Sequence, residues 1–223
     1  MSKLYIVPTP VGNLEDITHR AVRVLDEVDL ILAEDTRRTG ILLKRYGLAK
    51  KTLPHHKFNE HKFLASLVSR IGRGEKMALV SEAGMPGISD PGYLLIRECL
   101  SEGIPVEALP GPTAFVPALV ASGLPCDRFC FEGFLPQKKG RMKKLEELRD
   151  ETRTMIFYES PYRVRKSLEQ FAVIFGEDRP ACLAREISKI HEEYLRGSLM
   201  EIVQNLGERE IKGECILVVG GKP

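Results

Sequence analysis

The stretch VSEAGMPGISDPG, residues 80–92, decides how this chain folds. It begins at the end of the short apolar run MALV, residues 77–80, which predicts a buried parallel strand. Asp90 can cap a following helix, and Pro91 suits the first helical position. The apolar stripe of that helix, with the glycine that ends it, is Leu95, Ile96, Cys99, Leu100 and Gly103.

A loop between the carboxyl end of a strand and a helix is where open α/β sheets bind ligands. The glycines of the 80–92 loop let its backbone approach a ligand closely, and its prolines fix its shape. A tight structural turn explains the same composition. The stretch alone leaves a ligand site and a structural turn about equally supported.

The first half of the chain alternates strands with helices. Strands are predicted at 4–7, 30–33, 77–80 and 106–109, and Asp16 can cap the first helix. The turn PGPT, residues 110–113, opens a further helix from about Thr113 to Ser122. This alternation predicts a parallel sheet covered on both faces, in an N-terminal α/β domain spanning residues 1–122.

The second half predicts another α/β domain, residues 123–223, after a boundary at ASGLP, residues 121–125. Ser160 can cap a helix that has Pro161 at its first position, and a further helix spans 198–206. Its predicted strands are 128–133, 154–158, 181–184, 193–196 and 213–219. The natural ligand site of such a chain is a cleft between the two α/β domains.

The segment EDTRR, residues 34–38, places two carboxylates and two arginines at a strand end. They can bind a ribose hydroxyl or orient a substrate. A helix cap with ion-paired neighbours is an equal alternative.

Charge is uneven although the net charge is only +2. One basic cluster is Arg37, Arg38, Lys44, Arg45, Lys50, Lys51, Lys57 and Lys62, and a second is Lys138, Lys139, Arg141, Lys143 and Lys144. Two such clusters favour a polyanionic partner. A solvated helix face is the alternative.

Composition narrows the class of protein further. The five cysteines are an odd number in mostly apolar surroundings, so we expect buried free thiols and no metal site. No apolar run approaches the ~20 residues that span a bilayer. Residues 1–8 run into a strand pattern rather than a signal peptide, which favours the cytoplasm.

Seven motifs give the chain a family resemblance. They are VPTPVGNLEDIT, AEDTRRT, LVSEAGMPGISDPG, PGPTA, FEGFLPQKKGR, FYESPYR and LAREISKIHEEYLRG. The sequence resembles the ribosomal RNA small subunit methyltransferase I family, within the tetrapyrrole-methylase-like class. Many members continue into a further helical region, so a sequence ending at Pro223 is a short member or a truncated one.

The resemblance implies two α/β domains that hold S-adenosylmethionine between them, usually in a homodimer. The reaction it implies is methylation of the ribose 2'-hydroxyl of a cytidine in the decoding region of 16S ribosomal RNA. The cofactor-binding residues it implies are Pro8, Pro10, Ala83, Gly84, Met85, Ile88, Ser89, Asp90, Thr113, Ala114, Tyr158, Ala184 and Arg185.

The chemistry of this reaction suggests catalytic residues. A ribose hydroxyl is a weak nucleophile that benefits from a hydrogen-bond acceptor, and guanidinium groups hold phosphates. The candidates just past strand ends are Asp35, Glu82 and Glu159, with Arg37, Arg38 and Arg163 for phosphate. A tetrapyrrole methylase and a non-catalytic ribosome-binding module are the rival interpretations.

Overall fold

The computed structural model describes residues 3–223. Met1 and Ser2, which the sequence places ahead of the first strand, lie outside the described residues. The chain divides into two compact units, the first ending at Thr113 and the second running from Ala114 to Pro223.

The first unit is built on a parallel sheet, as predicted. Its strand order is β3-β2-β4-β1-β5, and every neighbouring pair runs parallel. The edge strand β3 was not foreseen in the sequence. The strands are β1 (Leu4–Ile6), β2 (Leu30–Ala33), β3 (Thr52–Pro54), β4 (Met77–Val80) and β5 (Val106–Ala108).

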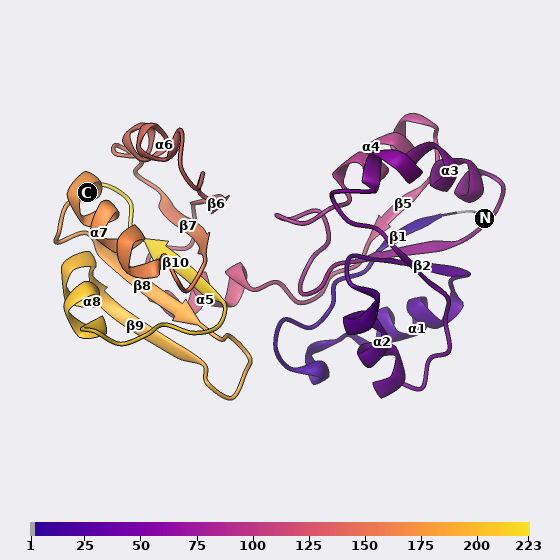
Figure 1. The fold of residues 1–223 in the computed structure, drawn as a ribbon, viewed down its shortest axis with the longest axis horizontal. Coiled ribbons are helices and arrows are strands. Elements are labelled where there is room, and N and C mark those ends of the chain that lie inside the picture. Colours follow the sequence, from indigo (N-terminus) through magenta and orange to yellow (C-terminus); the bar gives the residue numbers. More distant parts are fainter. Residues whose placement is uncertain (1–2) are drawn as a thin grey trace. The chain divides into compact units, whose positions relative to one another are not determined.

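Helices cover both faces of this sheet (Figure 1). One face packs on α1 (His19–Glu27) and α2 (Thr36–Arg45). The other packs on α3 (Glu60–Gly72) and α4 (Tyr93–Ser101). The adjacent strands β1 and β4 therefore send their helices to opposite faces, which is the topological switch point where such sheets bind ligands.

The second unit has a mixed sheet of order β6-β7-β10-β8-β9. Only β6 and β7 are parallel, because β10 runs antiparallel to both β7 and β8, and β9 antiparallel to β8. The strands are β6 (Phe129–Phe134), β7 (Thr154–Glu159), β8 (Pro180–Arg185), β9 (Glu193–Ser198) and β10 (Cys215–Val219).

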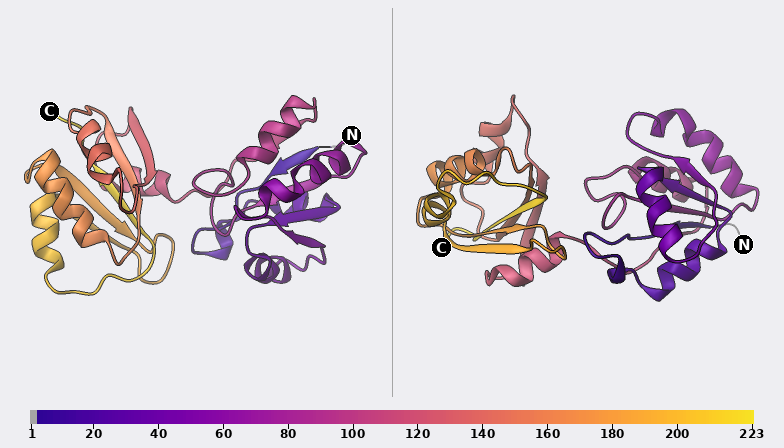
Figure 2. Two further views of the ribbon diagram at one scale, coloured as in Figure 1. Left: turned by 45° about the horizontal axis from the view of Figure 1, so that its top comes forward. Right: turned by 60° about the horizontal axis from the view of Figure 1, so that its bottom comes forward.

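Helices also cover both faces of the second sheet (Figure 2). The helices α7 (Val164–Phe175) and α8 (Leu199–Leu206) pack together on one face, with α6 (Arg141–Glu147) beside α7. The other face packs on α5 (Phe115–Ser122).

Helix α5 explains why the division differs from the predicted boundary after Ser122. Its buried Ala118 and Leu119 pack against Ile156 and Ile216 of the second sheet. The helix therefore belongs to the second unit, and the turn before it ends the first.

Three predicted helix starts are wrong. Helix α1 is capped by Thr18, whose hydroxyl accepts the Ala21 N–H, while Asp16 ends a short 3-10 turn. Helix α4 begins only after Gly92, so Asp90 does not cap it. Helix α7 begins after Arg163, so Ser160 lies before a non-helical turn.

Two findings bear on the class of protein. Within residues 3–223, no helix is long and apolar enough to cross a membrane. All five cysteines are free thiols, and only Cys126 is exposed.

Candidate functional site

Three loops meet at the carboxyl edge of the first sheet. The loops after β1 and β4 bond to each other, because Thr9 N donates to Gly84 O at 3.0 Å and Gly84 N to Thr9 O at 2.8 Å. The loop after β5 joins them, since a Cβ on Gly111 would lie 2.9 Å from the Pro8 ring. The predicted loops after these strands are thus brought together.

The β4 loop holds unusual backbone conformations. Ser89 has φ +65°, a left-handed value that costs free energy outside glycine and gathers at functional loops. Gly92 has φ +133°, and a Cβ there would lie 2.6 Å from a methyl of Leu79. The second half of the motif therefore needs glycine at residue 92 for packing as well as for conformation.

Helix α3 holds this loop from outside the motif. The buried carboxylate of Glu60 accepts the Gly92 N–H at 3.1 Å. It also lies 3.8 Å from Nε2 of His55, whose side chain is fully buried. Burial lowers the pKa of His55, so its ring is neutral at physiological pH. The sequence pattern does not reveal the role of either residue, because a buried histidine or glutamate inside a basic run has no periodic signal.

Three carboxylates gather at the same edge: Glu34, Glu82 and Asp90. Burial and, after it, the charges of Glu34 and Glu82 together raise the pKa of Asp90 to about 7, against an opposing hydrogen bond from the Ser81 side chain. Burial, followed by the charge of Glu82, also raises the pKa of Glu34. The cluster carries excess negative potential, so it suits a cationic group.

In the segment after β2, the two arginines Arg37 and Arg38 pair with different carboxylates. Asp35 caps α2 by accepting the Arg37 N–H, and it pairs with the Arg37 guanidinium at 2.8 Å. That pairing lowers the pKa of Asp35 to about 2, which leaves it a weak base. Arg38 instead reaches Glu82 across the strand ends, at 3.4 Å.

A hollow of about 190 Å³ lies beside these groups. Thr9, Pro10, Arg38, Ser81 and Glu82 are among its lining residues. It is smaller than the ~300 Å³ of a typical small-molecule pocket, so it holds part of a ligand at most.

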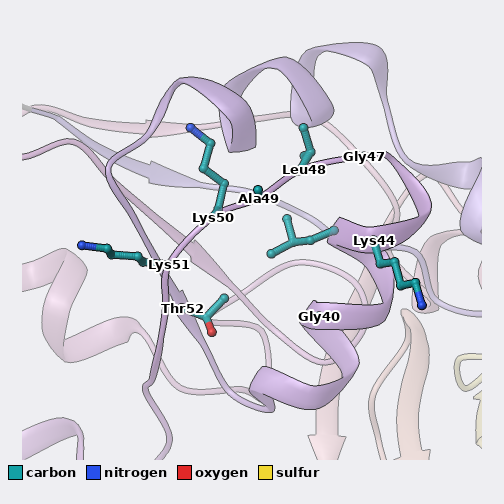
Figure 3. A pocket seen from close by; sticks show the side chains of 9 residues that line it. Gly40, Lys44, Gly47, Leu48, Ala49, Lys50, Lys51 and Thr52 are labelled. Carbon is teal, nitrogen blue, oxygen red and sulfur yellow. The ribbon is translucent and has the colours of Figure 1, made fainter.

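A second hollow lies at the far end of α2, between Gly40, Gly47 and Thr52 (Figure 3). Its lysines, Lys44, Lys50 and Lys51, splay away from one another in Figure 3. Lys50 already contacts the Val28 carbonyl and Asp26. This hollow has no converging charge for an anion.

In the second unit, Glu159 and Arg141 form a buried ion pair. Arg141 donates to Glu159 at 3.0 Å, and their side chains are 9% and 6% exposed. The Ser167 hydroxyl donates to the same carboxylate at 2.6 Å, and the Ser160 N–H donates to its other oxygen. This arrangement gives both predicted site residues a structural role in fastening α6 to β7.

The other predicted residues of the second unit lie in varied surroundings. The Tyr158 ring contacts Phe131 and Phe134 at centroid distances of 5.1 and 5.4 Å. Ala184 is fully buried. Arg185 donates to Glu193 at 2.7 Å and to the Lys212 carbonyl at 3.1 Å.

The second basic cluster is mostly on the surface. Lys138, Lys139 and Lys143 are exposed, and Lys144 is paired with Glu132 at 2.7 Å. Only Arg141 of this cluster is buried. No group of three or more potential metal ligands occurs within residues 3–223.

The Glu60 tether gives the first prediction. Glu60→Ala leaves the buried Gly92 N–H without an acceptor, so the free energy of unfolding should fall by about 1–3 kcal/mol. Glu60→Gln keeps an acceptor oxygen and should lose less than half of that. Urea unfolding, with hydrogen exchange at the Gly92 amide, measures both. Equal exchange of that amide in all three proteins would show that Glu60 does not hold the loop.

Comparisons with known proteins bear on this site. Residues 3–203 match the family model described as Tetrapyrrole (Corrin/Porphyrin) Methylases. The chain is 47% identical to a protein of Thermotoga maritima named "Ribosomal RNA small subunit methyltransferase I", over 100% of both chains. It is 49% identical to a protein of the same name from Escherichia coli O157:H7, over 98% of this chain and 78% of that one.

Solved structures share the fold at low identity. The methyltransferase CobJ superposes with a TM-score of 0.74 at 19% identity, over 99% of this chain and 95% of that one. Uroporphyrin-III C-methyl transferase from Thermus thermophilus, complexed with S-adenyl homocysteine, superposes with a TM-score of 0.68 at 19% identity. The match covers 98% of this chain and 97% of that one. Together with the family model, these structures confirm the predicted fold class of two α/β units of tetrapyrrole methylase type.

Proposed function

Because the chain belongs to the ribosomal RNA small subunit methyltransferase I family of the tetrapyrrole methylases, we propose that it methylates the ribose 2'-hydroxyl of a cytidine in the decoding region of 16S ribosomal RNA. Membership confirms the resemblance drawn from the sequence motifs. It also confirms the predicted cofactor, since the family depends on S-adenosylmethionine. The observation that carries the proposal is the identity of 47–49% to relatives with this name over almost the whole chain.

The residues of the first unit fit this cofactor. It carries a sulfonium and an ammonium group, and the Glu34, Glu82 and Asp90 cluster offers negative charge beside three loops with close backbone packing. When bound, it supplies an electrophilic methyl carbon. From the resemblance we propose these contacts: Pro8, Pro10, Ala83, Gly84, Met85, Ile88, Ser89, Asp90 and Thr113 in the first unit, and Ala114, Tyr158, Ala184 and Arg185 in the second.

Methyl transfer needs alignment and a place for the hydroxyl proton. The cofactor would supply the methyl group, and this chain would have to hold the attacking hydroxyl in line with it and accept the hydroxyl proton. Among the predicted carboxylates, Glu82 is the one we propose as acceptor, because its pair with Arg38 is the longest of the three, at 3.4 Å, and its side chain is 40% exposed at the strand ends. Asp35 is held by Arg37, and Glu159 is held in its buried pair with Arg141.

The proposed RNA binding rests on cations of which most are exposed. Arg37 is 88% exposed and lies next to the strand-end carboxylates, so it can hold a phosphate without losing its place at the helix cap. The proposed RNA contacts are Arg37, Arg38, Lys138, Lys139, Lys143, Lys144 and Arg163. We leave Arg141 out of this set, because its guanidinium already donates hydrogen bonds to Gln170, Glu159 and Ser167 inside the second unit.

A tetrapyrrole methylase is the second candidate, because solved structures with this fold are named as uroporphyrin-III-C-methyltransferase and cobalt precorrin-4 methyltransferase. Their identity of 19–23% supports the fold alone, whereas the ribosomal RNA relatives are much more similar.

The resemblance also leads us to propose a homodimer, which sedimentation equilibrium at micromolar concentration tests. An enzyme that modifies ribosomal RNA acts in the compartment that holds ribosomes, which is where we propose that this protein works.

Transfer of a labelled methyl group separates these candidates. The protein is incubated with methyl-labelled S-adenosylmethionine in four parallel reactions. These contain, in turn, small ribosomal subunits, protein-free 16S RNA, large subunits and uroporphyrinogen. We expect label in small-subunit RNA in one of the first two reactions and none in the last two. Label in uroporphyrinogen alone would select the second candidate, and no label in any reaction would favour the binding-module interpretation.

A further inference from the structure

A phenylalanine projects into solvent close to the candidate site. Phe58 is 85% exposed, and it lies in the turn between β3 and α3. Burying such a ring typically gains about 1.5–3 kcal/mol, so leaving it in water forgoes that stabilisation. An exposed ring at the carboxyl edge of the sheet is a candidate contact for a partner.

The turn that carries Phe58 is braced on its inner side. Asn59 Oδ1 accepts the His56 N–H at 2.8 Å, and Asn59 Nδ2 donates to the Pro54 carbonyl at 3.0 Å. The His55 N–H donates to Ala33 O of the neighbouring strand at 2.8 Å. With the buried His55 and Glu60 on either side, the backbone under Phe58 is fixed before any partner binds.

A lysine and a histidine lie beside the ring. Lys57 Nζ lies 5.0 Å from the centroid of the Phe58 ring, and the His56 ring meets it edge-on at 6.0 Å. One helical turn further on, Lys62 Nζ lies 5.5 Å from the Phe63 centroid. Interleaved aromatic and basic side chains fit single-stranded nucleic acid, because bases stack on rings while cations attract phosphates.

The turn lies near the carboxylate cluster. The His55 N–H donates to the carbonyl of Ala33, the residue before Glu34, and Glu60 accepts the N–H of Gly92, two residues after Asp90. The charge of Lys57 accordingly opposes the rise in the pKa of Glu34. A nucleotide on Phe58 would therefore lie beside the strand ends where we propose the chemistry.

We propose that Phe58 is a stacking platform for an unpaired base of the RNA substrate, next to the nucleotide that is methylated, with Lys57 on the adjoining phosphate. This inference rests on the proposed function and deepens it. Stacking there would hold the strand open so that one ribose reaches the strand-end carboxylates, and it tolerates any base because every base has a π-face.

Fluorescence tests the stacking directly, because the chain contains no tryptophan. Phe58→Trp places a single reporter in the turn. Val173→Trp, at a position 78% exposed on α7 of the second unit, is the matched control. On adding a cytidine hexaribonucleotide at low salt, we expect saturable quenching at residue 58 by more than half and little at residue 173.

Three outcomes would overturn the proposal. Equal quenching of both reporters would mean that the base does not stack at the turn. Quenching by S-adenosylhomocysteine alone would assign the ring to the cofactor. A blue-shifted emission that depends on protein concentration and ignores RNA would mean that a second copy of this chain covers Phe58.

Turnover of small ribosomal subunits gives the second test. Phe58→Leu should lower kcat/KM about 10- to 100-fold, mainly through KM, while Phe58→Tyr should stay within about threefold of wild type. Equal activity of the Leu variant and an active wild type would overturn the stacking role only. Inactivity of the wild type on every RNA would instead remove the proposed function.

Discussion

Asp90→Asn is expected to make the protein more stable above pH 7. The pKa of Asp90 is raised to about 7 in the folded protein, against about 3.8 for a free carboxyl, so the folded state binds the extra proton between these values. Wild-type stability should therefore fall as pH rises through this window and stay low above it. Allowing for partial solvent access, the variant should gain on the order of 1–3 kcal/mol at pH 8 and nothing at pH 4.

The same change should weaken cofactor binding. An ionised Asp90 attracts the cationic S-adenosylmethionine, so we expect the wild-type affinity to rise as pH increases through 7. Asp90→Asn should lose about tenfold or more in affinity at pH 8, since a charge-assisted contact contributes about 1.5–3 kcal/mol. Titration calorimetry across pH measures this.

Asp127→Asn, which changes an exposed carboxylate of the second unit, is the control. It should change neither the free energy of unfolding nor the affinity for S-adenosylmethionine. Chemical unfolding of the wild type and both variants from pH 4 to pH 8 tests the predicted change in stability. Parallel stability curves for wild type and Asp90→Asn would mean that Asp90 ionises normally. The carboxylate cluster would then not carry the excess negative potential described above.

Arg141→Met is expected to cause the largest loss of stability in the second unit. It leaves the 6%-exposed Glu159 carboxylate without its cation, and removing one partner of a buried pair costs about 3–5 kcal/mol. The Ser167 and Ser160 donors that remain favour the lower end of this range. Adding Glu159→Gln removes the uncompensated charge and should recover at least half of the loss.

Lys144→Met is the matched control on the same helix. Its pair with Glu132 is 36% exposed on the lysine side, so the loss should stay below about 1 kcal/mol. Urea unfolding compares the variants. Near-wild-type stability of Arg141→Met, together with weaker RNA binding, would contradict the structural role and restore Arg141 as an RNA contact.

Much of the fold could be predicted from sequence, because buried parallel strands are short apolar runs with glycine or proline loops at their ends. The loops after β1, β4 and β5 were predicted and do meet. Strand β3, with the sequence TLP, is too short and too little buried to give such a pattern. Helix α5 was predicted, but its apolar residues say nothing of which sheet they cover.

The details of the site were harder to predict. An Asp or Ser before a proline reads as a helix cap, yet at Asp90 and Ser160 the chain makes a further turn before its helix begins. In the sequence Glu34 is only one of two adjacent carboxylates, since its proximity to Asp90 and Glu82 depends on strand order. Arg141 looked like one cation among five, and only its packing against Gln170 and Glu159 distinguishes it.

Nucleoside analysis of the modified RNA tests the central claim most directly. Small-subunit RNA treated with the protein and methyl-labelled S-adenosylmethionine is digested in parallel to nucleosides and to ribonuclease fragments of known sequence, which are separated and weighed by mass spectrometry. The account predicts that the label appears as 2'-O-methylcytidine at a single site in the decoding region. Label on a cytosine base, on another nucleoside or in large-subunit RNA would contradict it.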